Sequence, residues 1–194
     1  MSYNFFAYMA RMKFIRRWGL MKSVTVENIA EHSAQVAQLA HALALIRNKK
    51  FGGDLNADRI ATMALYHETS EVMTGDLPTP IKYYNESIRK SYKDIEHTAN
   101  EKLIAMLPEE FRQDYRELIE LEPSSVEHEI IKAADKLSAY IKTVEELNAG
   151  NREFAMAEKA LRAEVEKYRR LPEVDWFCNT YLNSFSLTLD ELGE

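Results

Sequence analysis

Apolar residues recur at the spacing of an α-helix along almost the whole chain, and no segment shows the alternating pattern of a β-strand. Val36, Leu39 and Leu43, for example, share one face of a helix that would run from Asn28 towards Phe51. With only six glycines and five prolines, the chain has few residues that interrupt such patterns. The sequence therefore predicts an all-α protein.

Capping residues and helix breakers divide the pattern into about seven or eight helices that would pack as a compact bundle. Asn28 with Glu31, and Ser124 with Glu127, have the spacing of a capping box, and Asn56 is a further candidate N-cap. The expected helices cover about residues 2–17 (with Ser2 as N-cap), 28–51, 56–75, 88–106, 108–121, 124–147, 152–170 and 174–185. The segment 76–80 contains two prolines and is expected to be a loop.

Length and composition indicate one globular domain, residues 1–194, in the cytoplasm. No apolar run is long enough to cross a membrane, and no signal peptide is recognisable. The formal charge of −6 argues against a nucleic acid polymer as a partner. Cys178, the one cysteine, stands in an apolar helical segment and is expected to be a buried structural thiol.

Two polar residues, His32 and Asp135, stand in helical segments that are otherwise apolar on one side. An ionised aspartate costs several kcal/mol there unless it is paired or bound to a cation. The ordinary interpretation of Asp135 alone is an ion pair with Lys132 or Lys136. His32 alone is more often a capped or half-exposed surface residue, and His41 points to nearly the opposite face of the same helix.

The segment His67–Glu71 could supply further ligands. His67 and Glu71 would share a helix face, while Glu68 would lie about 100° round the helix, so that His67 and Glu68 could reach one cation between their faces. Two solvated glutamates beside a core histidine are the plain alternative. The segment begins like the H-E-x-x-H helix of zinc peptidases, but Glu71 stands where the second histidine would be.

Several longer stretches carry a family resemblance: FFAYMARMKFIRRWGLM, TVENIAEHSAQVAQLAHALA, YHETSEVMTGDLPTPIKYYN, IKAADKLSAYIK and EELNAGNREF. With these, the chain resembles the bacterial HD-domain 5′-deoxynucleotidases over nearly its whole length. The resemblance implies an all-α HD-type bundle that hydrolyses deoxyribonucleoside 5′-monophosphates to deoxyribonucleoside and phosphate with metal-activated water. It also implies a homodimer, for which the aromatic residues of segment 176–185 could form an interface or simply the core.

The resemblance assigns roles position by position. It implies one divalent transition metal ion, with Co²⁺ or Mn²⁺ favoured and Zn²⁺ or another ion as the alternative, and Glu68 stands where the family has aspartate. The implied metal ligands are His32, His67, Glu68 and Asp135. The residues implied to meet the substrate are Arg17, Trp18, His32, Asp76, Leu77, Pro78, Thr79 and Asp135. Glu71 and Arg17 are the residues implied to act in catalysis.

Other interpretations stay open for the same residues. Arg17 could be the solvated basic end of the first helix, and Trp18 could be a core residue. If Glu68 spoils the metal site, the chain would be a non-catalytic nucleotide-binding or regulatory module. It could also be an HD-type phosphohydrolase that acts on another phosphate ester.

Overall fold

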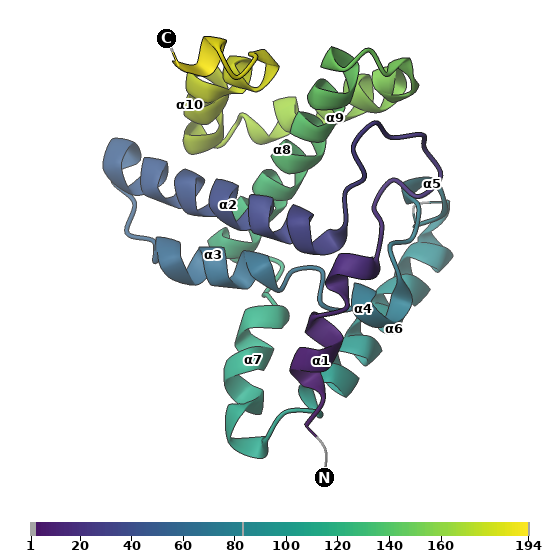
Figure 1. Ribbon diagram of the computed structural model, residues 1–194. Coiled ribbons are helices and arrows are strands. Elements are labelled where there is room, and N and C mark those ends of the chain that lie inside the picture. The colour runs from purple at the N-terminus through teal and green to yellow at the C-terminus, as the bar shows by residue number, and fades with distance from the viewer. Residues whose placement is uncertain (1–2, 83, 194) are drawn as a thin grey trace.

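The computed structural model describes residues 3–82 and 84–193, and within these ranges the chain forms helices and no strand (Figure 1). The all-α prediction is therefore confirmed. The α-helices are α1 (Phe5–Met9), α2 (Ile29–Phe51), α3 (Ala57–Leu65), α4 (Glu71–Thr74), α5 (Thr79–Lys82), α6 (Glu86–Ile104), α7 (Arg112–Ile119), α8 (Val126–Asn148), α9 (Ala155–Tyr168) and α10 (Pro172–Tyr181). Short 3-10 helices, such as η1 (Met12–Phe14) and η3 (Arg152–Phe154), join some of them. None of the described helices is both long and apolar enough to span a lipid bilayer.

The larger hydrophobic core forms where α2 packs against α3, α8 and α10 (Figure 1). Val36 and Leu43 of α2 are fully buried there, as their helical spacing predicted. Ile60 of α3 and Ile141 of α8 are buried against them. Cys178 of α10 lies in the same core, where burial raises the pKa of its thiol to about 11, which confirms a structural thiol.

A second, smaller core joins α1, α6 and α7 in the part of the molecule that holds the N-terminus (Figure 1). Phe5 is its central residue, with its ring 5.0 Å from the ring of Tyr115. Ala64 belongs to the larger core, whereas Tyr66 and Val72 pack on the smaller one. The segment between α3 and α4 therefore passes from one core to the other.

Two of the expected N-caps are confirmed. The Asn28 side chain accepts hydrogen bonds from the backbone of residues 30 and 31, and Glu31 completes the capping box. The Asn56 side chain accepts from the backbone N–H of Arg59 at 2.9 Å. The third, Ser124, is wrong by one residue, because Ser125 caps α8 by accepting from the backbone N–H at position 128. Ser2 lies outside the described residues.

The expected third helix, 56–75, is wrong in its second half, because α3 ends at Leu65. Two side chains donate hydrogen bonds to backbone carbonyls there. His67 Nδ1 donates to the Ala64 carbonyl at 2.7 Å, and Thr69 Oγ1 donates to the Tyr66 carbonyl at 2.6 Å. Local side-chain hydrogen bonds of this kind compete with the helical ladder. The helix therefore gives way to a series of turns before α4 begins.

Two other expectations need correction. The first helix does not continue to residue 17; α1 ends at Met9, and only the short η1 follows it. The loop expected at 76–80 ends early, because α5 begins at Thr79 with Pro80 in its first turn. Proline is tolerated there because the first helical N–H groups have no partner within the helix.

Candidate metal centre

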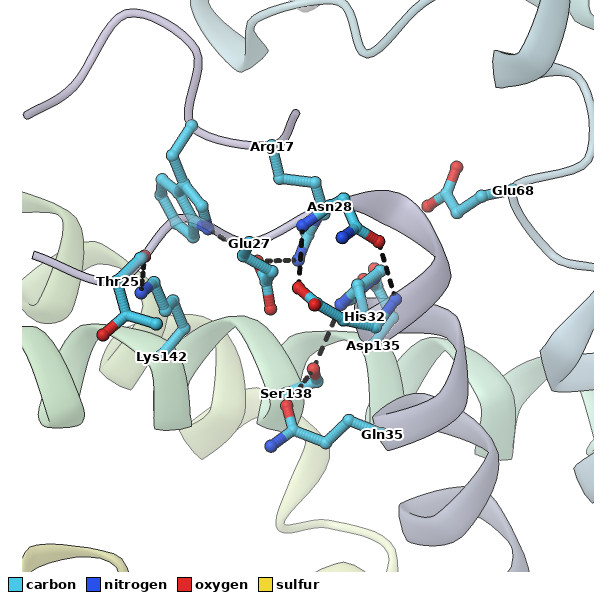
Figure 2. A network of polar contacts seen from close by, with 12 residues as sticks. Arg17, Thr25, Glu27, Asn28, His32, Gln35, Glu68, Asp135, Ser138 and Lys142 are labelled. Atoms are coloured by element: carbon cyan, nitrogen blue, oxygen red, sulfur yellow. Dashed lines mark hydrogen bonds and ion pairs between the residues drawn. The ribbon is translucent and has the colours of Figure 1, made fainter. Parts of the chain in front are cut away.

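Four of the predicted site residues come together between the two cores. His32 lies in the first turn of α2, His67 and Glu68 lie in the turns after α3, and Asp135 lies in the middle of α8. Each offers one ligand atom, and these atoms all lie within 4.8 Å of one another. Figure 2 shows His32 beside Asp135, with Glu68 extending towards them from a separate segment. The distances from His32 Nε2 to Asp135 Oδ1 and from His67 Nε2 to Glu68 Oε1 are both 3.2 Å.

Hydrogen bonds at Nδ1 orient both imidazoles so that Nε2 faces the cluster. Ser138 Oγ donates its proton to Gln35 Oε1, so it can only accept from His32 Nδ1, which lies 3.1 Å away. The Ala64 carbonyl, likewise, can only accept from His67 Nδ1. In a neutral imidazole whose Nδ1 carries the proton, Nε2 is an unprotonated lone pair.

These two Nε2 atoms are buried, and neither has a hydrogen-bond partner among the described residues. Each lies 3.2 Å from a carboxylate oxygen, so two imidazole nitrogens and two carboxylates lie close together. Buried polar atoms without partners are costly and rare. A cation would satisfy all four groups at once, and imidazole nitrogen with carboxylate oxygen is a donor set that suits first-row divalent metals. The residues therefore fit a metal ion.

Burial and the neighbouring charges shift the pKa values of three residues of this cluster. Burial would raise the pKa of Asp135, but His32 and the Lys136 ammonium, 3.1 Å from Oδ2, hold it well below its usual range. Burial also opposes the charge of Glu68, yet the neighbouring His67 lowers the pKa of this carboxyl. Burial and then the charge of Arg17 lower the pKa of His32. The expected pairing of Asp135 with Lys136 is thus present, but it occupies only one of the two carboxylate oxygens.

Glu71 and Asp76 lie next to the cluster. Glu71 is buried at the start of α4, and burial together with the charge of Glu68 raises its pKa to about 10. Burial also raises the pKa of Asp76, in the segment after Gly75, while the charge of Arg17 opposes that rise. The predicted sharing of a helix face by His67 and Glu71 is wrong, because the chain is not helical between them.

The other predicted residues of this segment are only partly placed. Leu77 and Pro78 are half-buried between α4 and α5. Thr79 begins α5, and its side chain lies outside the described part of the structure. His41 is apart from the site, as expected, with Nε2 3.2 Å from Asp58 Oδ1 on the surface.

Arg17 and Trp18 lie in the segment that joins η1 to α2, and one residue that the sequence did not single out holds both. Glu27 Oε2 accepts from Arg17 Nη1 at 2.9 Å and from Trp18 Nε1 at 3.0 Å. Figure 2 shows the Arg17 and Glu27 side chains facing each other near His32. Arg17 is therefore not the solvated end of a helix, and Trp18 is only half-buried, with its ring 5.3 Å from that of Phe154.

Comparison with known proteins shows the family of this chain. Residues 4–185 match the family described as 5′-deoxynucleotidase YfbR-like. The chain belongs to this family. It is 57% identical over 191 residues to a 5′-deoxynucleotidase from Vibrio vulnificus and 51% identical over 192 residues to 5′-deoxynucleotidase YfbR from Escherichia coli. These matches cover 98% of this chain in both cases, and 98% and 96% of the two relatives.

Solved structures show which fold the YfbR-like chain has. An HD-domain phosphohydrolase from Listeria innocua superimposes with a TM-score of 0.83 at 24% identity, over 94% of this chain and 88% of that one. The cyanophage S-2L HD phosphohydrolase DatZ, bound to dA and one catalytic Zn²⁺ ion, gives a TM-score of 0.66 at 19% identity, over 92% of this chain and 96% of that one. The fold is thus the all-α HD-domain fold that the sequence resemblance implied.

Proposed function

We propose that this protein is a metal-dependent 5′-deoxynucleotidase, which hydrolyses deoxyribonucleoside 5′-monophosphates to deoxyribonucleoside and phosphate. The observation that carries the proposal is the buried pair of imidazole nitrogens without hydrogen-bond partners that face two carboxylates, with the cation of Arg17 close by. The identity of 51–57% to relatives named 5′-deoxynucleotidase supports the substrate class. The chain would work as one domain and as a cytoplasmic homodimer, which light scattering after size-exclusion chromatography would test.

His32, His67, Glu68 and Asp135 would hold one divalent ion. Such an ion supplies a Lewis acid that offsets phosphate charge and lowers the pKa of a water molecule towards neutrality. The mixed nitrogen and oxygen donors suit Co²⁺ or Mn²⁺, and Zn²⁺ is the alternative that DatZ, a protein of the same fold, illustrates. Glu68 has one methylene more than aspartate, a reach longer by roughly 1.5 Å, so metal preference is where this chain would differ from relatives with aspartate there.

Arg17 would bind and orient the phosphate. Glu27 occupies only Nη1, and a guanidinium has five N–H donors in a planar fork, so donors remain for two phosphate oxygens. His32 and Asp135, from the opposite wall, would also meet the substrate at its phosphate end. The charge of Arg17 lowers the pKa of His32 and opposes the rise in the pKa of Asp76, which supports a position for the guanidinium beside the phosphate.

Glu71 would move the proton that hydrolysis requires, between a water molecule and the leaving 5′-oxygen. Its burial at the start of α4, directly beside Glu68, supports this role. Asp76 would accept a hydrogen bond from a sugar hydroxyl, and the following residues would line the sugar and base side of the pocket. Trp18 would form the wall that leaves no room for a 2′-hydroxyl. The lining residues proposed for this side are Leu77, Pro78 and Thr79.

Phosphate release from matched panels of deoxyribonucleoside and ribonucleoside 5′-monophosphates tests the proposal, first after chelation and then with Co²⁺, Mn²⁺, Zn²⁺ or Mg²⁺ restored. We expect release that depends on metal and is confined to the deoxy series. Equal release from both series would favour a phosphohydrolase for another ester. No release with any ion from a folded protein would favour a non-catalytic nucleotide-binding module.

A further inference from the structure

We propose that Glu27 is a positioning residue that holds Arg17 and Trp18 in one fixed arrangement and thereby sets the preference for deoxyribose over ribose. The inference rests on the proposed function, because it concerns how that substrate is selected. Glu27 has no place in the ligand set or among the residues proposed to touch substrate. Its role would be exerted through the two side chains it binds.

The central observation is that a single oxygen serves both partners. Glu27 Oε2 lies 2.9 Å from Arg17 Nη1 and 3.0 Å from Trp18 Nε1. The Arg17 and Glu27 side chains are only 15% and 12% exposed, so water screens their ion pair weakly. The guanidinium of Arg17 also lies over the Trp18 ring, 5.8 Å from its centre. Arg17, proposed to bind the phosphate, and Trp18, proposed to exclude a 2′-hydroxyl, therefore cannot move independently of each other.

The backbone at Trp18 needs such support. Its φ angle is 59°, and it is the only residue other than glycine with a positive φ in the described ranges. Bulky side chains rarely adopt this left-handed conformation, and they keep it only where surrounding contacts enforce it. The backbone N–H of Arg17 donates to the Glu27 carbonyl at 3.0 Å, so Glu27 holds this segment with its main chain as well as its side chain.

The residues just before Glu27 are anchored to α8, the helix that carries Asp135. Glu146 accepts from the backbone N–H groups of Val24 and Thr25 at 2.8 and 3.1 Å. Lys142 donates to the Thr25 carbonyl at 2.6 Å (Figure 2). It also donates to Glu146 at 2.5 Å. Both charged side chains are buried, with residue exposures of 4% and 2%. Glu27 is thus fixed relative to the helix that supplies a metal ligand.

Three contacts and the left-handed backbone then determine where the Trp18 ring lies. The contacts are the hydrogen bond to Glu27, the guanidinium of Arg17 and the ring of Phe154. Without the first, the indole could turn about its side-chain bonds and make room for a 2′-hydroxyl. Loss of Glu27 should therefore act mainly on the choice between sugars, whereas general loosening of the fold would slow both substrates alike.

The test compares kcat/KM for a deoxyribonucleotide and its ribonucleotide in Glu27→Ala and Glu27→Gln. The alanine removes both contacts, and we expect the deoxy-to-ribo ratio to fall by about ten-fold or more, with bound metal unchanged. Glutamine keeps an oxygen that can accept from Trp18 Nε1, so it should restore most of the ratio while KM rises because Arg17 has lost its charged partner. An unchanged ratio in Glu27→Ala would overturn the proposal.

Two further variants separate positioning from structural damage. Glu31→Ala breaks the nearby capping box without touching Arg17 or Trp18, so it should lower the Tm and leave the ratio unchanged. Trp18→Phe keeps an aromatic ring but removes the N–H donor, so it should lower the ratio even if Glu27→Ala does not fold. In the Trp18→Phe background, Glu27→Ala should change the ratio no further. An unchanged ratio in Trp18→Phe would also overturn the proposal.

Failure of this inference is distinguishable from failure of the proposed function. If the unaltered protein releases phosphate from deoxyribonucleotides selectively but Glu27→Ala keeps that selectivity, only the role of Glu27 is lost. If the unaltered protein shows no selective release, the proposed function itself is wrong.

Discussion

Two clusters of histidine and carboxylate side chains in this protein look alike in composition but differ in environment. In one, the potential ligand atoms of His32, His67, Glu68 and Asp135 lie within 4.8 Å of one another, and those of His97, Glu101 and Glu120 do so in the other. The first lies between two hydrophobic cores, and the second lies on the surface of α6 and the end of α7. Proximity of ligand-type atoms therefore does not separate the two clusters.

The two clusters differ in whether their polar atoms have hydrogen-bond or ion-pair partners. In the surface cluster, His97 Nδ1 lies 2.7 Å from Glu120 Oε1, and Arg116 forms ion pairs with both Glu101 and Glu120. The protein itself supplies the positive charge there, and water reaches the rest. In the buried cluster, two imidazole nitrogens have no hydrogen-bond partner. The comparison teaches that buried imidazole nitrogens without partners, and not residue types alone, single out the candidate metal site.

The largest expected effect is from His67→Ala, which removes one of those two imidazole nitrogens. We expect metal affinity to fall by more than about 100-fold, because even partners outside the ligand shell contribute 10- to 100-fold. Phosphate release should fall with it at metal concentrations that saturate the unaltered protein. Isothermal titration of the metal-free protein measures the affinity directly, and normal affinity in this variant would remove His67 from the ligand set.

Glu71→Ala tests whether Glu71 acts in catalysis without being a ligand of the metal ion. Because Glu71 is proposed to move a proton and not to bind the ion, kcat should fall by about 10² to 10⁴-fold while metal content and nucleotide binding persist. Stopped assays with metal analysis on the same sample check both parts. Turnover close to normal would show that Glu71 has no part in the chemistry.

A smaller effect is expected from Glu68→Asp. The carboxylate is kept but its reach shortens by roughly 1.5 Å, so the relative affinities for Co²⁺, Mn²⁺ and Zn²⁺ should shift while hydrolysis continues. Competition titrations between pairs of these ions would measure the shift. If every affinity stays the same, Glu68 is not a ligand, and the four-residue cluster reduces to three.

His97→Ala should have the smallest effect. An exposed ion pair contributes little to stability, and Arg116 already neutralises the surface carboxylates, so metal content and kcat/KM should change by less than about two-fold. A drop in bound metal from this variant would place an ion at the surface cluster and undo the distinction between the two regions.

Much of the buried cluster could be predicted from the sequence. His32 and Asp135 are polar residues in helical segments that are otherwise apolar on one side, and the family resemblance implied all four residues as ligands. The helix break after Leu65 could not be predicted, because it depends on His67 turning back to the Ala64 carbonyl. A helical pattern in the sequence carries no sign of that competing bond.

Glu27 was missed for a different reason. It contacts Arg17 and Trp18 only because the segment between them folds back on itself. That turn needs a left-handed backbone at Trp18, a residue type that does not predict one. The error at Ser124 was smaller in kind, since two adjacent serines offer the same cap and only packing decides that Ser125 takes it. Contacts that depend on loop conformation and packing could therefore not be predicted from the sequence pattern.

The most direct test of the buried cluster as the metal site is anomalous diffraction from crystals grown with Mn²⁺ or Co²⁺, with data collected on both sides of the absorption edge. We predict one strong anomalous peak among His32, His67, Glu68 and Asp135, and none beside His97. A peak at the surface cluster with none at the buried one would contradict the account.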